Sequence, residues 1–343
     1  MDLHRSLGVE LPVIQAPMAG AQVGALAIAV CRAGGLGSLP CAMLDAAAIR
    51  REIGAIRAAI GSRSFNLNFF CHRPPVVDAA REAAWRSALA PYYAEFGLDI
   101  SAVPALPARY PFDATSAELV EELRPPVVSF HYGLPDEPLL GRVRATGARI
   151  LASATTVDEA LWLERRGVAA VIAQGLEAGG HRGHFLSADL SRQCGTFALV
   201  PQLVRALNVP VIAAGGIADR DGVEAVLRLG ASMVQVGTAY LCCAEASTSA
   251  LLRKALMSDA ARHTALTRLI TGRPARGIVN RLMREVDDAL APEFPLATAA
   301  IAPLRAAAEA RGSLDFSPIW CGQNASGCAE RPAGELTREL AGV

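Results

Sequence analysis

Residues 173 to 185 read AQGLEAGGHRGHF and place a histidine directly after two glycines, at the end of a short apolar run. Gly179 and Gly180 lack a Cβ atom, so the backbone there can approach a bound molecule closely. Histidine titrates near neutral pH. His181 can therefore accept a proton from a carbon acid or, as a cation, attract an anionic substrate. We expect His181 to be the catalytic residue.

Two further turns combine glycine with the end of an apolar run. They are AAGGI at 213 to 217 and VQVGTAY at 234 to 240. Glycine in such turns lets consecutive backbone N–H groups point at one anion. Together they predict a phosphate site, and the phosphate could belong either to a sugar-phosphate substrate or to flavin mononucleotide (FMN).

Other candidate residues supply amide and apolar groups rather than charge. The only lysine is Lys254, and it does not lie at the end of an apolar run, so no Schiff-base lysine is expected. Asn68 and Gln174 can hydrogen-bond the polar edge of an isoalloxazine ring. The apolar face of that ring can lie against Ala16, Pro17 and Met18. These residues favour FMN over a sugar phosphate.

Three more side chains are candidates for the same pocket. His131 ends the apolar run in SFHYG and is expected either to line the pocket or to make a structural hydrogen bond. Tyr110 could supply a hydroxyl to the substrate pocket. Arg182 could help attract an anionic substrate, but we interpret it as a solvated loop arginine.

The elements that must position these residues are eight short apolar runs, most of them followed by an amphipathic helical pattern that ends at glycine. Apolar strands alternating with helices indicate a parallel sheet, and eight repeats indicate a closed (β/α)8 TIM barrel. An open doubly wound sheet would normally carry GxGxxG after its first strand, and this chain has none. The eight predicted strands are residues 12–18, 35–40, 64–70, 126–132, 148–153, 168–174, 210–216 and 232–238.

Two segments do not follow the eightfold pattern. We expect residues 1–244 to form the barrel, with an insertion at 71–115 after the third strand. Residues 245–312 would form a mostly helical lid or substrate subdomain, and 313–343 would return to the barrel mouth. Since barrel active sites lie at the C-terminal ends of the strands, both extra segments are expected to roof the pocket.

Composition excludes several classes of function. The 343 residues include 33 Lys+Arg and 33 Asp+Glu, so no net charge favours nucleic acid or an anionic membrane. No run of about eighteen apolar residues could span a bilayer, and the N-terminus does not resemble a signal peptide. The eight cysteines lack paired CxxC spacing, which indicates free thiols and no zinc site. We expect a cytoplasmic protein, either a monomer or a homodimer.

Seven motifs, in order between about residues 10 and 327, carry a family resemblance: LPVIQAPMAG, SFNLNFF, SFHYG, QGLEAGGHRG, AAGGI, QVGTAY and FSPIWCGQ. Together they resemble the nitronate monooxygenases, formerly 2-nitropropane dioxygenases, of the FMN-dependent class I type. The resemblance implies that His181 is the catalytic histidine. It also implies an FMN held by Asn68, Gln174, Gly179, Gly216, Gln235, Val236, Gly237 and Thr238.

The implied reaction uses O2 to oxidise an alkyl nitronate of the propionate 3-nitronate type to a carbonyl compound and nitrite, and neutral nitroalkanes are further candidate substrates. The chain departs from the family where a Tyr, Tyr, Lys stripe would face the substrate. We align Ala297, Ile301 and Arg305 there, which implies a bulkier or less polar substrate.

Three alternatives remain open at this point. The first is an NAD(P)H-dependent quinone or enoyl-thioester reductase on the same FMN barrel. The second is a flavin-free barrel that isomerises or cleaves a phosphorylated metabolite. The third is a binding protein that has lost turnover.

Overall fold

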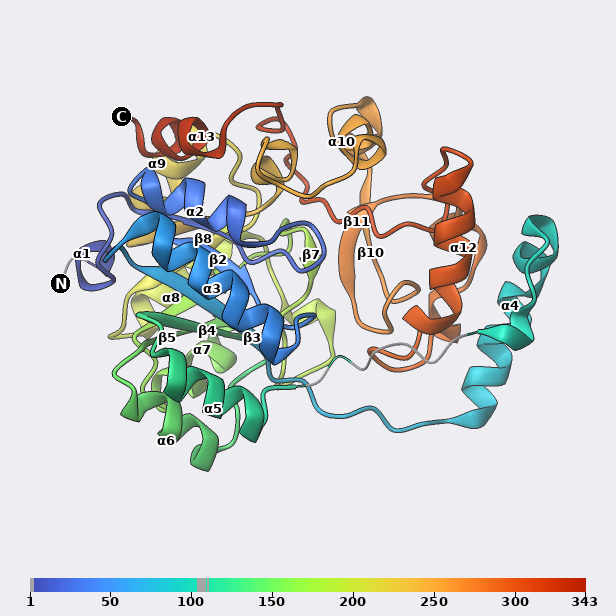
Figure 1. Cartoon of the computed structure of the whole chain (residues 1–343), viewed down its shortest axis with the longest axis horizontal. Helices are drawn as coiled ribbons and strands as arrows, with labels where there is room; N and C mark the ends of the chain where they lie inside the picture. Colours follow the sequence, from blue (N-terminus) through green and yellow to red (C-terminus); the bar gives the residue numbers. More distant parts are fainter. Residues whose placement is uncertain (1–2, 104–108, 110) are drawn as a thin grey trace.

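The computed structural model describes residues 3–103, 109 and 111–343. Eight parallel strands form a nearly closed barrel in the order β1-β9-β8-β6-β5-β4-β3-β2 (Figure 1). The ring closes through Leu36, just before β2, which pairs with Ile14 of β1. All eight predicted strands are confirmed: β1 (Val13–Gln15), β2 (Gly37–Pro40), β3 (Phe65–Phe70), β4 (Val127–His131), β5 (Arg149–Ala154), β6 (Ala170–Gln174), β8 (Val211–Ala214) and β9 (Met233–Val236).

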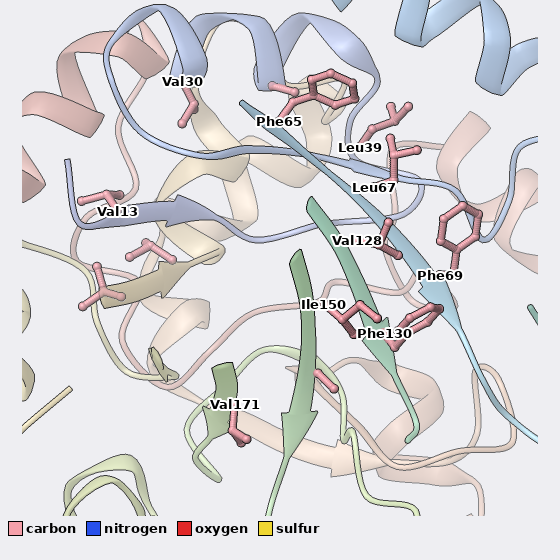
Figure 2. Close-up of a cluster of buried hydrophobic side chains, with 14 of the residues drawn as sticks. Val13, Val30, Leu39, Phe65, Leu67, Phe69, Val128, Phe130, Ile150 and Val171 are labelled. Carbon is pink, nitrogen blue, oxygen red and sulfur yellow. The ribbon is translucent and has the colours of Figure 1, made fainter. Parts of the chain in front are cut away.

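Side chains alternate between the two faces of this barrel, as the two-residue period of a strand requires. On β4, Val128 and Phe130 point outward and join the core between strands and helices, which Figure 2 shows. Val127 instead points inward, into a second apolar cluster that includes Ile172 and Met233. Leu3 belongs to that inner cluster, so the N-terminal helix α1 (Leu3–Ser6) packs against the inside of the barrel.

A ring of helices covers the outer face. Its last member, α13, packs on α2 and α9, so the chain ends beside the first barrel helix (Figure 1). An earlier part of the same C-terminal segment, at Trp320, Gly322 and Asn324, lies at the barrel mouth. The ring consists of α2 (Gly24–Arg32), α3 (Ala46–Ile60), α5 (Ala114–Leu123), α6 (Glu137–Ala145), α7 (Val157–Glu164), α8 (Thr196–Ala206), α9 (Arg220–Arg228) and α13 (Ala333–Ala341).

The two segments outside the eightfold pattern pack against each other. Helix α4 (Ala79–Phe96), from the insertion, lies on α12 (Thr298–Ala310), from the C-terminal region, at one side of the barrel (Figure 1). Their shared core contains Trp85, Leu89 and Phe316. The Tyr93 hydroxyl donates to the Ala300 carbonyl at 2.7 Å, which ties the helices together. We call this unit the lid.

A small antiparallel sheet joins the lid to the barrel, and the sequence did not predict it. Its strands are β10 (Thr264–Thr267), β11 (Ala275–Ile278) and β7 (Gly180–His181), in the order β10-β11-β7. The remaining short elements are α10 (Ala250–Leu256), α11 (Arg281–Glu285), η1 (Ile100–Ala102), η2 (Leu190–Arg192), η3 (Thr238–Cys242), η4 (Asp259–Arg262) and η5 (Asp288–Leu290).

Candidate active site

One pocket lies over the C-terminal ends of the barrel strands, and we call it the reaction pocket. Successive side chains of a strand point to opposite faces of the barrel. Phe69 and Phe130 point outward into the core between strands and helices, so their neighbours Asn68 and His131 point inward to the pocket. Gln174 and Gln235 point inward in the same way. The predicted site residues that line this pocket are Ala16, Pro17, Met18, Asn68, His131, Gln174, Gly179, Gly180, His181, Gly216, Gln235, Gly237 and Thr238.

Two predicted site residues are not among those that line it. Val236 follows Gln235, so its side chain points outward into the core between strands and helices, where it is 1% exposed. Only the backbone of Val236 can contribute to a binding site in the pocket. Its carbonyl already accepts a hydrogen bond from the Ala16 N–H at 2.8 Å. Tyr110 lies outside the described residues.

His181 is held in a strand and not in a free loop. Residue Ala275 of β11 pairs with it across the small sheet, and its Nε2 lies 2.9 Å from the Thr271 hydroxyl. Its ring lies 5.4 Å from the Phe294 ring and 5.5 Å from the Trp320 ring, measured between centroids. The imidazole is therefore fixed by both its backbone and its side-chain contacts.

The surroundings of His181 are cationic. Burial lowers the pKa of His181 well below its usual 6.5, and the nearby charges of Arg109 and Arg273 lower it further. The imidazole is thus neutral at pH 7 and can act as a base or hydrogen-bonding group. Of the two roles that the sequence left open, the lowered pKa favours the base over the cation, and Arg109 and Arg273 supply positive charge nearby.

His131 uses both ring nitrogens for structural contacts. Its Nδ1 lies 2.8 Å from the Ser153 hydroxyl, and its Nε2 lies 3.3 Å from the His181 carbonyl. Burial lowers its pKa to about 3, so it is neutral. His131 therefore lines the pocket and also supports the backbone of His181, which joins the two roles that the sequence left open.

Arg182 corrects another expectation. It is 0% exposed and donates to the carbonyls of Gln174 and Gly175 at 2.8 and 2.7 Å, and to Gln193 Oε1 at 2.9 Å. The Gln174 amide closes the same loop, donating to the His181 carbonyl at 2.9 Å and accepting the Gly183 N–H at 2.7 Å. Arg182 is a structural clamp of the β6–β7 loop, not a solvated side chain.

The glycine turns converge on one side of the pocket. Gly215 and Gly216 both have positive φ, 114° and 74°, a conformation that favours glycine. The C-terminal segment joins them: Asn324 Nδ2 donates to the Gly216 carbonyl at 3.1 Å, and the Gly322 N–H donates to the Thr238 hydroxyl at 3.0 Å. Loops from three distant parts of the chain thus form one wall.

Several pocket residues escaped the sequence reasoning. Phe70, Arg109 and Trp320 line the pocket, and Thr271 contacts His181. Phe70 had a usable signal, because it lies two residues after Asn68 and must face the same way. Arg109 and Thr271 had no such signal in the sequence, since their positions depend on packing between distant parts of the chain.

The side chains of Ala297, Ile301 and Arg305 do not line the reaction pocket. Ala297 and Ile301 are 0% and 1% exposed in the lid core. Arg305 forms an ion pair with Glu309 at 2.8 Å. The α12 residues Thr298, Ala299 and Ala300 instead line a second cavity, between the barrel and the lid.

Other classes of site find no support in the described part of the chain. No cluster of His, Cys, Asp or Glu there could hold a metal ion. No helix among the described residues is long and apolar enough to cross a membrane. All eight cysteines are free thiols, as predicted.

The fold and the pocket define a (β/α)8 barrel enzyme with a buried histidine and glycine-rich turns at the strand ends. Comparison with known proteins makes the family specific: the nitronate monooxygenase family model matches residues 2–342. The chain belongs to the nitronate monooxygenase family, whose members are oxidoreductases and in general depend on flavin.

Individual relatives support the same family assignment. A nitronate monooxygenase of Pseudomonas aeruginosa is 44% identical, over 98% of this chain and 97% of its own. A nitronate monooxygenase of Paraburkholderia phytofirmans is 43% identical, over 97% of this chain and 92% of its own. The crystal structure of nitroalkane oxidase from Streptomyces ansochromogenes superposes with a TM-score of 0.89 at 36% identity, covering 99% of this chain and 97% of that one. These findings do not favour the reductase alternative.

Proposed function

We propose that this protein is an FMN-dependent nitronate monooxygenase that oxidises alkyl nitronates of the propionate 3-nitronate type with O2, giving a carbonyl compound and nitrite. The observation that carries the proposal is the position of His181 on the wall of the same pocket as the glycine turns. A neutral histidine, a nearby arginine charge and a phosphate cradle are the groups that this reaction needs around a flavin.

The residues present fit FMN on three counts. Gln235 Oε1 is buried without a hydrogen-bond partner in the described structure, so it can accept an N–H of the ring system. Ala16, Pro17 and Met18 offer an apolar surface for the ring face. The backbone at Gly216 and Gly237 would hold the phosphate, because consecutive N–H groups in glycine turns bind anions. When bound, FMN supplies the redox chemistry.

Two predicted contacts need adjustment in this proposal. The Gln174 amide is engaged at both ends by the β6–β7 loop, so it would support His181 more than it would contact the ring. Asn68 Nδ2 donates to the Ser129 hydroxyl at 3.0 Å, which leaves Asn68 Oδ1 as its group for the cofactor.

The charges around His181 favour an anionic substrate. A nitronate is already deprotonated, so it needs a positive neighbour, and Arg109 would provide one. A neutral nitroalkane would have to give its proton to His181. The resulting imidazolium would lie near Arg109 and Arg273, whose charges, together with burial, lower the pKa of His181. Nitronates should therefore be better substrates than neutral nitroalkanes.

The test is anaerobic mixing of the purified, FMN-loaded protein with propionate 3-nitronate, nitroethane or NADH in separate cuvettes while the flavin absorbance is followed. The proposal expects a fast change with the nitronate, a much slower one with nitroethane and little with NADH. Nitrite should appear when oxygen is admitted. Rapid bleaching by NADH with no response to the nitronate would instead indicate a reductase.

A further inference from the structure

A second cavity, of about 1350 Å³, lies between the barrel and the lid. We call it the lid cavity. Its described walls come from residues 41–49, from the end of β3, from the insertion and α5, and from residues 292–300, and they are mostly apolar. Phe69, Trp85, Phe112 and Leu119 line one part of it, and Leu296 and Ala299 line another. A cavity of this size and lining can take a ligand portion larger than a two- or three-carbon chain.

The lid cavity adjoins the reaction pocket. Met43, Phe70 and Arg109 line both. Arg109 makes no side-chain hydrogen bond or ion pair with the described residues, and its guanidinium carbon lies 5.7 Å from the Phe294 ring centroid. The junction therefore places the Arg109 guanidinium, which has no ion-pair partner among the described residues, between His181 and an apolar space.

These features point to an amphipathic anion. An anionic head would pair with Arg109 near His181, and an apolar tail would leave past Phe70 into the lid cavity. On α12 the wall carries only the small side chains Thr298, Ala299 and Ala300, which leave the space open. Burying a tail there removes apolar area from water on both the ligand and the protein.

We propose that the lid cavity binds the apolar tail of the substrate, so that the enzyme prefers nitronates with medium-length alkyl chains. This inference rests on the proposed function for the identity of the head group. It assigns a substrate class to a cavity distinct from the reaction pocket.

The experiment compares kcat/KM for ethyl, butyl, hexyl and octyl nitronate. For the wild type, kcat/KM should rise by about three- to fourfold per added CH2 group until the cavity is filled. Two filling variants from opposite walls, Ala299→Phe and Ala46→Phe, should change ethyl nitronate turnover less than about twofold and remove this rise. Ala306→Phe, an exposed change on the same helix, should behave like the wild type.

Binding of the non-reacting carboxylates propionate and octanoate, measured by calorimetry on the FMN-loaded protein, gives a second readout. Octanoate should bind more tightly to the wild type and Ala306→Phe, and lose that advantage in both filling variants. A flat wild-type series, or an unchanged rise in both filling variants, would overturn the tail site. If no nitronate of any length turns over, the proposed function fails, and the octanoate comparison still decides whether the cavity binds a tail.

Discussion

At the residue scale, the contact between His181 Nε2 and Thr271 Oγ1 determines which ring nitrogen is free. The Thr271 hydroxyl lies 3.4 Å from the Arg273 carbonyl, to which it can donate. It then accepts from the Nε2–H of His181, at 2.9 Å, which leaves Nδ1 unprotonated. Thr271 is therefore a positioning residue for the histidine.

Replacing Thr271 with valine keeps its volume and removes this hydrogen bond. We expect Thr271→Val to lower kcat by about tenfold, since a lost hydrogen bond of roughly 1.4 kcal/mol changes a rate by that factor. KM for the nitronate should change little. Thr271→Ser keeps the hydroxyl and should recover most of kcat, and equal losses in both variants would reduce Thr271 to a packing role.

At the element scale, the wall formed by three loops depends on close backbone approach at Gly179. A Cβ atom built there would lie 2.5 Å from the Gly322 nitrogen and 2.6 Å from the Cys321 carbonyl carbon. Neither is a flexible side-chain end, so the C-terminal segment would have to move away from the cradle.

Gly179→Ala should therefore lower thermal stability by about 1–3 kcal/mol and reduce the fraction of FMN that stays bound through gel filtration. Gly54, in the exposed part of α3, has open space where a Cβ would lie, with no neighbouring atom within 4 Å. Gly54→Ala is the matched control and should be neutral or slightly stabilising. Retention of FMN and melting temperature in Gly179→Ala equal to those of the control would show that the loops do not need this close contact.

The elements also show what a sequence can and cannot predict. The eight barrel strands were predictable because each is a buried apolar run with its own turn signals, and the order of motifs along the chain placed His181, Asn68 and the glycine turns at one end. Strand β7 could not be predicted, because two residues are too few to show a periodicity and because its partner Ala275 lies more than 90 residues further along the chain. The burial of Arg182 was equally hidden, since its acceptors are mainly backbone carbonyls.

At the scale of the whole molecule, buried neutral histidines link stability to pH. Burial lowers the pKa of His72 to about 4 and that of His131 and His184 to about 3, and it also lowers the pKa of His181. In the unfolded chain each would titrate near 6.5. The unfolded state therefore binds more protons than the folded state between about pH 6.5 and 4, so stability is full above this window and falls as pH decreases through it.

Urea unfolding at pH 7.5, 6 and 5 measures this dependence. Each of these histidines contributes a loss of up to about 1.4 kcal/mol per pH unit below 6.5, so the free energy of unfolding should drop steeply between pH 6 and 5. The carboxylates with lowered pKa, such as Glu95 and Glu122, lose their stabilising contribution only as pH falls toward and below their ordinary value of 4.5, so they add little to a loss between pH 6 and 5. A constant free energy of unfolding from pH 7.5 to 5 would contradict the neutral state of these histidines.

The bonds that join Gly322, Gln323 and Asn324 to the turns at Thr238, Glu177 and Gly216 also set an order of events during synthesis. A growing chain that already contains all eight strands still lacks one wall of its pocket until residues 322–324 have also left the ribosome. A ribosome stalled shortly before Gly322 would therefore carry a barrel that lacks these hydrogen bonds on one side of its pocket.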